Sequence, residues 1–272
     1  MADHWGIHSR QWANIGTPLR PSVKDIAYIE RLLSEVNRTS TNSVLLGVTP
    51  EIACLNWPTN TNLVAVDHNP EMIARVWPHK MVSVPAMAAL GDWMQLPLKD
   101  ASVDVVVGDG CYTLLVGREK YGALSREVRR VLKSNGQLIM RFFVRPDTSE
   151  KIESVLDDLR NGKIGNFHVF KWRLAMALHG SFESGVAVAE VWKAWQAAGI
   201  DVNLLAHVVG WSRSVIETIN AYRESHARYS FPTLSELRAA LAPYFRVVSC
   251  HYPDYELGER CPTLLLEPCT QC

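Results

Sequence analysis

Short apolar runs alternate with helix-like segments along the first half of the chain, and this alternation constrains the fold more than any other feature. A strand followed by a helix and another strand is typical of crossover units, which build a mostly parallel sheet. Val103–Val107 has four valines and one charged residue, Asp104, and such a valine-rich run is typical of a parallel strand buried on both faces. The other runs are Ser43–Leu46, Leu63–Val66 and Gln137–Phe143, and the helix-like segments are Ser22–Asn37, Pro50–Asn56, Pro70–Val76 and Lys120–Lys133. This order predicts an α/β fold with a doubly wound sheet.

The strand pattern stops at about Thr148 and returns after Ser230. Four helical segments fill this interval without a strand between them: Ser149–Leu159, Phe167–Leu178, Val186–Ala198 and Ser212–Arg228. A capping box, Thr233-Leu234-Ser235-Glu236, then begins a helix to Leu241, and Phe245–His251 and Thr263–Glu267 form the last two strands. We therefore expect three parts: an N-terminal arm and helix (1–40), an α/β core (41–147 and 231–268) and a helical cap (148–230).

Charge and composition exclude several classes of protein. The chain has 28 Lys+Arg and 28 Asp+Glu, so its net charge is zero, whereas nucleic-acid binders usually carry a basic domain or stripe. No apolar run approaches the roughly 20 residues that span a bilayer. The first residues lack the apolar core of a secretory signal, so we expect a cytoplasmic protein without membrane contact.

The six cysteines do not form a disulfide framework in a chain of 272 residues. Cys269 and Cys272 make a Cys-x-x-Cys pair near the end, with two readings. They are either reduced thiols at a frayed terminus or two soft metal ligands, and a structural zinc site needs four. We therefore predict no metal site.

A glycine turn follows the first strand and points to a ligand site. Leu46 is followed by Gly47, Thr49 can cap the next helix, and Pro50 takes its first position. Asp67 ends the second strand, 67 − 47 = 20 residues after the glycine. A carboxylate at that spacing can accept hydrogen bonds from both hydroxyls of a ribose. Two alternatives remain at this stage: an ordinary strand-to-helix turn at Gly47, and a helix-capping role for Asp67.

Four segments in order resemble class I S-adenosylmethionine-dependent methyltransferases. The first is Asp67-His68-Asn69-Pro70-Glu71-Met72-Ile73, similar to the family's second-strand segment. Three more follow: Gly91-Asp92-Trp93-Met94-Gln95-Leu96-Pro97, Ser102-Val103-Asp104-Val105-Val106-Val107, and Arg130-Val131-Leu132-Lys133-Ser134-Asn135-Gly136-Gln137-Leu138-Ile139-Met140. The resemblance covers about 40–145 and the closing hairpin. It implies a Rossmann-like, mostly parallel seven-stranded sheet with an antiparallel last strand.

The resemblance also implies a cofactor, S-adenosylmethionine, with S-adenosylhomocysteine as product. Asp67 would hold the ribose hydroxyls, Asp92 would accept from the adenine amino group, and Trp93 would flank the ring. Asp109 would face the sulfonium and the acceptor, with a plain turn at Asp109-Gly110 as the alternative. The full set of implied cofactor-binding residues is Gly47, Thr49, Glu51, Asp67, His68, Met72, Asp92, Trp93, Asp109 and Gly110.

The first motif departs from the family pattern. The family has an acidic residue two before the first glycine and two further glycines, whereas this chain has Leu45, Thr49 and Glu51. Glu51 has two equal readings: the missing carboxylate for the cofactor's ammonium group, or a glutamate that complements the helix dipole.

Methyl transfer from a sulfonium is an in-line displacement, so orientation supplies much of the rate. A general base is needed only where the acceptor carries a proton to lose, and Asp109 and Tyr112 are the candidates. We expect acceptor specificity in the cap and in the arm Trp5–Arg20, which reads either as a lid or as a surface-packed segment. The aromatic and thioether side chains of the cap read either as core or as pocket walls: Phe167, Trp172, Met176, Trp192, Trp195 and Trp211.

These features predict a methyltransferase that acts on a small-molecule acceptor rather than on nucleic acid. Two other functions remain open. One is a cofactor-binding protein without turnover, and the other is a nicotinamide-dependent oxidoreductase, since Gly47 and Asp67 suit either nucleoside.

Overall fold

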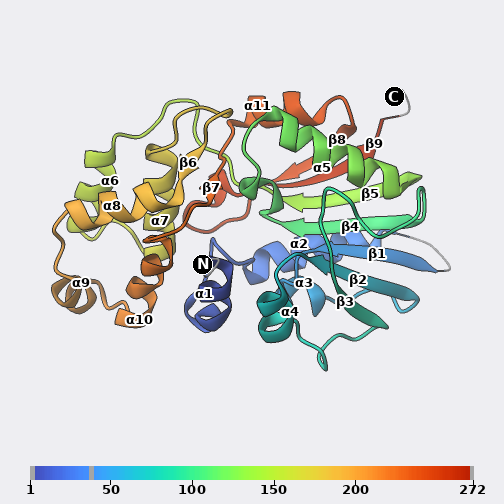
Figure 1. Ribbon diagram of the computed structural model, residues 1–272, viewed down its shortest axis with the longest axis horizontal. Helices are drawn as coiled ribbons and strands as arrows, with labels where there is room; N and C mark the ends of the chain where they lie inside the picture. The colour runs from blue at the N-terminus through green and yellow to red at the C-terminus, as the bar shows by residue number, and fades with distance from the viewer. Residues whose placement is uncertain (1–3, 37–39, 270–272) are drawn as a thin grey trace.

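A seven-stranded sheet forms the centre of the computed structural model, which describes residues 4–36 and 40–269 (Figure 1). The strand order is β3-β2-β1-β4-β5-β9-β8. Strands β1 to β5 pair in parallel, and β9 is antiparallel to both β5 and β8. The predicted fold class is therefore confirmed. The strands are β1 Thr41–Leu46, β2 Thr61–Asp67, β3 Ala86–Leu90, β4 Val103–Asp109, β5 Leu132–Arg141, β8 Phe245–His251 and β9 Thr263–Pro268.

The strand order reverses direction between β1 and β4, at the centre of the sheet. Leu46, the last residue of β1, pairs with Val66 of β2 on one side and with Gly108 of β4 on the other. The carboxyl ends of three strands therefore meet at this point. In open α/β sheets, the crevice beside such a reversal is where ligands bind.

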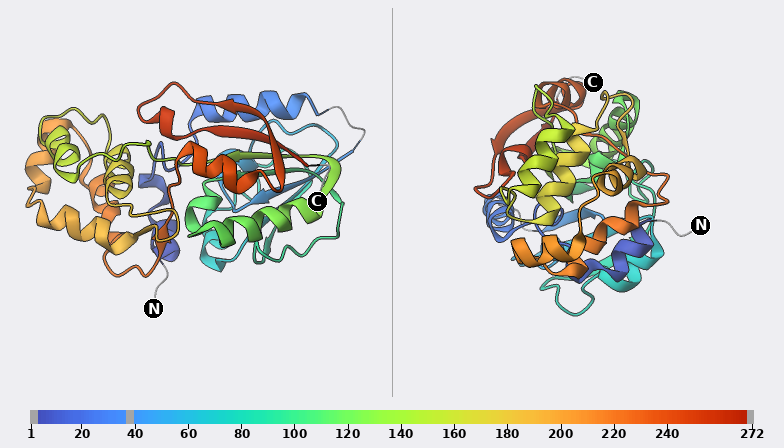
Figure 2. Two further views of the ribbon diagram at one scale, coloured as in Figure 1. Left: turned by 90° about the horizontal axis from the view of Figure 1, so that it is seen from above. Right: turned by 90° about the vertical axis from the view of Figure 1, so that its left-hand side faces the viewer.

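Helices cover both faces of the sheet (Figure 2). Leu45 and Val105 share a buried cluster with side chains of α2, α3 and α4, whereas Val44 and Val106 share one with α5 and α11. Alternate residues of one strand thus pack on opposite faces, as the pleat of a strand requires. These helices are α2 Val23–Ser34, α3 Pro50–Ala53, α4 Pro70–Val76, α5 Arg118–Val131 and α11 Leu234–Leu241.

The chain between β5 and α11 forms a separate helical layer beside the sheet, which we call the cap (Figure 1). Its apolar side chains form their own buried cluster, which includes Phe167, Trp195 and Ile219. The cap helices are α6 Ile152–Arg160, α7 Phe167–Ala177, α8 Val188–Ala197, α9 Val202–Val209 and α10 Arg213–Ile216, followed by a 3-10 helix, Glu217–Tyr222.

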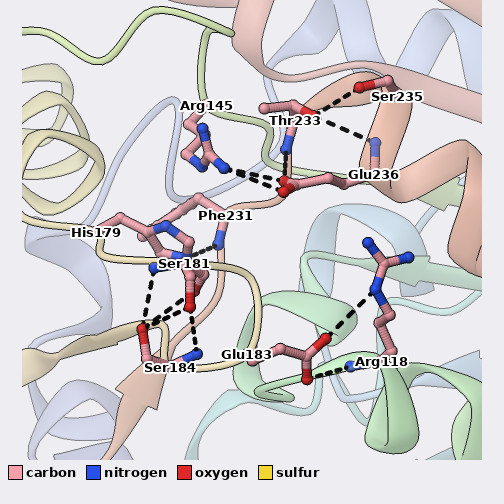
Figure 3. Close-up of polar contacts among 10 residues, drawn as sticks. All are labelled: Arg118, Arg145, His179, Ser181, Glu183, Ser184, Phe231, Thr233, Ser235 and Glu236. Carbon is pink, nitrogen blue, oxygen red and sulfur yellow. Dashed lines mark hydrogen bonds and ion pairs between the residues drawn. The ribbon is translucent and has the colours of Figure 1, made fainter.

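Polar contacts hold the cap where the chain leaves and rejoins the core (Figure 3). Arg145, after β5, donates from Nη2 to Glu236 Oε2 at 3.1 Å. The same carboxylate accepts from the Thr233 N–H at 2.8 Å and completes the predicted capping box of α11. On the cap side, the Phe231 N–H donates to His179 Nε2 at 3.1 Å.

Two expectations for the cap are wrong. The interval holds a short antiparallel ribbon, in which β6 (Val186–Ala187) pairs with β7 (Arg228–Tyr229). Two residues are too few to show the alternation by which a strand is recognised in a sequence. The expected helix Ser212–Arg228 is also broken, because α10 passes into the 3-10 helix, which ends at Tyr222 before the ribbon.

The N-terminal arm lies between the cap and the sheet. Its helix α1 (His4–Arg10) contacts α4 of the core and the 3-10 helix of the cap, and Figure 1 shows it there in dark blue. A 3-10 helix, Trp12–Asn14, follows it. Within residues 4–36 and 40–269, no helix is long and apolar enough to cross a membrane.

Candidate active site

A pocket opens at the carboxyl edge of β1, β2 and β4, where the strand order reverses. It holds about 860 Å³ of space between atoms, open solvent at its mouth included. Three parts of the chain line it. The sheet side contributes Leu46, Gly47, Val48, Thr49, Asp67, His68, Met72, Trp93, Asp109, Gly110, Cys111, Thr113, Leu114 and Phe143; the arm contributes Trp5, His8, Trp12, Ile15 and Leu19; the cap segment contributes Trp172 and Tyr229.

The glycine turn after β1 brings two other predicted residues close to its backbone. Gly47 has a φ of +91°, a backbone conformation that residues with a Cβ rarely adopt. A Cβ placed there would lie 3.8 Å from the Trp93 ring and 3.9 Å from Asp67 Oδ2. Pro50 begins α3 as expected, but the Thr49 side chain makes no capping hydrogen bond and instead lines the pocket.

Asp67 is buried at the end of β2, and it does not cap the next helix, because Asn69 does so. Asp67 Oδ1 accepts from the Asn69 N–H at 2.8 Å. Asn69 caps α4 by accepting from the Met72 N–H at 3.0 Å. Asp67 thus lines the pocket beside the turn at Gly47 rather than capping the helix.

An indole and an imidazole form one wall beside Asp67. The Trp93 indole N–H donates to Val66 O at 2.6 Å, which fixes the ring at the edge of the sheet. The His68 ring meets Trp93 edge-on at 6.4 Å between centroids. Met72 is buried and also lines this end of the pocket. A flat apolar ring can pack against these side chains.

Asp92 lies outside the lining of the pocket. Its side chain is exposed and accepts from the Met94 N–H at 2.9 Å, within its own turn. Its role toward the adenine amino group stays a prediction.

Glu51 contacts the arm, and it also lies outside the lining of this pocket. Its Oε1 accepts from Arg20 Nε at 2.6 Å, and Arg20 Nη1 donates to Trp12 O at 2.9 Å. The Arg20 guanidinium also lies over the Trp12 ring, 4.9 Å from its centroid. Glu51 Oε2 is buried and has no hydrogen-bond partner among the residues that the structure describes. The arm is therefore fastened to the first turn of α3 through one oxygen, and the other oxygen can accept a further donor.

Asp109 ends β4 and Gly110 follows it, and both line the pocket. Asp109 Oδ1 accepts from Arg141 Nε at 2.6 Å. Burial raises the pKa of Asp109 above its ordinary value, and the charge of Arg141 opposes that rise. Gly110 has a φ of +65°, and a Cβ there would lie 2.7 Å from the Phe143 ring. The turn therefore needs glycine for both its conformation and its packing.

The interpretation of Tyr112 as a candidate catalytic residue is wrong, because its hydroxyl lies in the core. It pairs with Ser125 Oγ at 2.9 Å, and the ring packs against Tyr121 and Phe142. Burial raises the pKa of the phenol above its ordinary value. The preceding residue, Cys111, lines the pocket instead.

The tryptophans divide between pocket and core. Trp5, Trp12, Trp93 and Trp172 line the pocket, so of the six cap residues considered only Trp172 does so. Phe167, Met176 and Trp195 are buried in the cap core, and Trp192 and Trp211 pack against it.

Sequence reasoning missed several other lining residues. Among them are Phe143, which follows β5, and Tyr229 of the ribbon. Their sequence neighbourhoods carry no motif. Within the described ranges, no group of three or more His, Cys, Asp or Glu side chains could hold a metal ion; Cys272 of the Cys-x-x-Cys pair lies outside the described residues.

Comparisons with known proteins concern the segment that forms most of the sheet and the fold as a whole. Residues 46–140 match a family model described as a methyltransferase domain. An uncharacterized methyltransferase-like protein of Schizosaccharomyces pombe is 34% identical over 121 residues, which span 43% of this chain and 44% of that protein. The chain therefore aligns with less than half of that relative's length.

Two solved structures share the fold over nearly all of the chain. An N-methyltransferase, NodS from Bradyrhizobium japonicum, determined with S-adenosyl-L-homocysteine, has a TM-score of 0.53 and 12% identity, with 98% of this chain and 99% of that chain covered. A protein from Rhodobacter sphaeroides described as a zinc-dependent alcohol dehydrogenase has a TM-score of 0.58 and 11% identity, with 99% and 100% covered. At these identities the likeness concerns the fold alone. Residues 46–140 are thus similar to a methyltransferase domain, and nearly the whole chain has the fold of the NodS structure.

Proposed function

We propose that the chain transfers a methyl group from S-adenosylmethionine to a small-molecule acceptor and releases S-adenosylhomocysteine. One observation carries this proposal: Gly47, Asp67 and Trp93 converge at the strand-order reversal, within the segment 46–140 that matches a methyltransferase domain. A buried carboxylate beside a glycine turn and an indole suits a nucleoside, because it offers acceptors for the ribose and a flat wall for the base.

The nucleoside end of the cofactor fits the residues that line this part of the pocket. We assign the ribose hydroxyls to Asp67 and the adenine to the space between His68, Met72 and Trp93. Gly47, Thr49 and Gly110 line the same pocket, and the two glycines leave their backbone bare for close approach.

We assign the ammonium group of the cofactor to the Glu51 carboxylate. Its Oε2 is buried without a partner in the part of the chain that the structure describes, and a buried acceptor normally has a donor. An ammonium group would supply that donor with opposite charge. Arg20 holds Oε1, so the carboxylate stays in one orientation.

When bound, S-adenosylmethionine supplies a methyl group on a positively charged sulfur, which is a good leaving group. The protein then has to orient the acceptor and exclude water. Asp109 lines the pocket at the end of β4, where its negative charge favours a positive centre, and Arg141 fixes its orientation. The arm and the cap enclose the site with Trp5, Trp12 and Trp172.

A small acceptor suits the enclosure and the charge of the chain. The lining of the pocket is mostly apolar, and its outer walls come from segments packed over the sheet edge. The net charge of zero offers no general attraction to a polyanion. For the location of this activity we propose the cytoplasm.

The proposal can be tested by following a labelled methyl group. The full chain is incubated with methyl-tritiated S-adenosylmethionine and a cell extract, which is then separated into small-molecule, protein and nucleic-acid fractions. We expect label in the small-molecule fraction with the wild type and none with Asp67→Ala. Label in the protein or nucleic-acid fraction would contradict a small acceptor. Cofactor binding without label in any fraction would instead support a binding protein without turnover.

A further inference from the structure

Two aromatic side chains, Phe143 and Tyr229, pack edge-on against Trp172, and all three line the pocket. The Trp172 ring meets Phe143 at 5.3 Å and Tyr229 at 5.5 Å, both edge-on with interplanar angles of 80°. These three rings come from α7, the segment after β5 and the ribbon strand β7. Because the rings are buried and interlocked, they form a fixed wall against which a flat molecule can lie.

The charges in the pocket do not favour a charged acceptor. Asp109 is paired with Arg141, and Asp67 belongs to the nucleoside end that the proposed function assigns to the cofactor. Among the described residues that line the pocket there is no lysine or arginine. An anionic acceptor would therefore lose its hydration without gaining a counter-charge, which is costly in a buried site.

Two indole N–H groups in the lining have no hydrogen-bond partner. Trp172 is 4% exposed, and its Nε1 has no hydrogen-bond partner within the described residues. Trp12 Nε1 likewise has no partner among these residues. A buried indole N–H usually has an acceptor. Both groups are donors, so the atom that would satisfy either one is an acceptor. A protonated amine offers only donors, whereas a hydroxyl, carbonyl or ether oxygen of an uncharged molecule accepts.

We infer that the methyl acceptor is a planar, uncharged, oxygen-bearing aromatic molecule that lies against Phe143, Trp172 and Tyr229 and accepts a hydrogen bond from Trp172 Nε1. This inference rests on the proposed function, because the cofactor occupies the nucleoside end. Trp172 then determines specificity: its ring face binds any flat molecule, and its N–H selects those that carry an oxygen at the right edge.

The inference is tested by binding, without turnover, to the full chain saturated with S-adenosylhomocysteine. The probes are 2-naphthol, naphthalene and 2-naphthoate, with affinities measured by ligand-observed NMR titration. We expect 2-naphthol to bind more tightly than naphthalene and 2-naphthoate more weakly than either. Trp172→Phe keeps an aromatic face and removes the N–H. It should weaken 2-naphthol about fivefold, the effect of one net hydrogen bond, and leave naphthalene unchanged.

Trp195→Phe is the matched control, because Trp195 is a buried tryptophan of the cap core outside the pocket lining. It should leave all three affinities unchanged. Equal weakening of 2-naphthol and naphthalene by Trp172→Phe would overturn the role of the N–H. Preferential binding of 2-naphthoate, or no binding of any probe, would overturn the acceptor class while the proposed function stands. Failure of S-adenosylhomocysteine to saturate the chain would overturn both. Should Trp172→Phe not fold, the order of the three probes on the wild type still decides the acceptor class.

Discussion

Arg141 Nε donates to Asp109 Oδ1 at 2.6 Å across the paired ends of β5 and β4, with side chains only 1% and 6% exposed. Arg141 Nη1 also donates to the Tyr255 hydroxyl at 3.1 Å, and it lies 4.0 Å from Asp25 Oδ2. Asp109, which lines the pocket, is thus part of a buried ionic network that extends beneath the sheet edge.

Arg141→Leu should destabilise the protein by about 3–5 kcal/mol, because it leaves Asp109 buried without its counter-charge. Urea unfolding measures this loss. Arg246→Leu is the control: its ion pair with Glu267 is 66% and 33% exposed, so its loss should be below about 1 kcal/mol. A loss below 1 kcal/mol for Arg141→Leu would show that the buried pair is not needed for folding.

Asp67→Ala should lower the affinity for S-adenosylhomocysteine at least about a hundredfold. Two charge-assisted hydrogen bonds to the ribose of about 1.5–3 kcal/mol each would be lost. Isothermal calorimetry gives the affinity. Asp254→Ala is the control, because Asp254 is exposed and outside the pocket lining, and it should leave the affinity unchanged. An unchanged affinity for Asp67→Ala would remove Asp67 from the nucleoside site.

Arg20→Met should release the arm from α3, because the Arg20 guanidinium joins Glu51 to the backbone of Trp12 and Ile15. We expect chymotrypsin to cleave the variant beside Trp12 faster than it cleaves the wild type. Mass spectrometry of the fragments over time measures the two rates. Arg10→Met removes a half-exposed pair with Glu71 and should leave the cleavage rate near that of the wild type. Equal rates for Arg20→Met and the wild type would rule out this attachment.

Acid should destabilise the cap through His168. Burial, together with the charge of Lys171, lowers the pKa of His168 to about 3, although its Nε2 contacts Asn14 O at 3.0 Å. In the unfolded chain the pKa of this histidine is about 6.5. Between about pH 6.5 and 3 the unfolded state therefore binds more protons at His168 than the folded state does. Stability is therefore constant above about pH 6.5 on this account and falls as the pH drops toward 3.

His168→Gln removes this titration while keeping a donor near Asn14. Between pH 7.5 and 5, the wild type should lose about 2 kcal/mol more unfolding free energy than His168→Gln, from integration of the proton linkage. Urea unfolding at both pH values gives the comparison, in which the other titrating groups cancel. Parallel losses in the two proteins would exclude His168 as the source.

The sheet could be predicted from the sequence because its signals are local. Val103–Val107 is a valine-rich run within β4, interrupted only by Asp104, and the Thr233–Glu236 capping box forms as expected. Strand β3 was not located from the sequence, because Ala86–Leu90 is an exposed, alanine-rich edge strand with neither alternation nor strong β propensity. Helix α9 was also missed, although Asp201 caps its start and Gly210 follows its end.

The acceptor side of the site could be predicted only in part. Trp172 carried a compositional signal, whereas Phe143 and Tyr229 reach the pocket through packing between segments distant in sequence. The pairing of Glu51 with Arg20 and of Asp109 with Arg141 likewise depends on tertiary contacts. Local propensities contain no information on such partners, so the sequence predicted the positions of these carboxylates but not their partners.

The central claim is that this pocket binds S-adenosylmethionine, and calorimetry on the full chain tests it most directly. S-adenosylhomocysteine and NAD are titrated separately, because both carry an adenosine that Asp67 could hold through its ribose. We predict saturable, equimolar binding of S-adenosylhomocysteine and none of NAD. Saturable binding of NAD without binding of S-adenosylhomocysteine would contradict the account and favour a nicotinamide-dependent oxidoreductase.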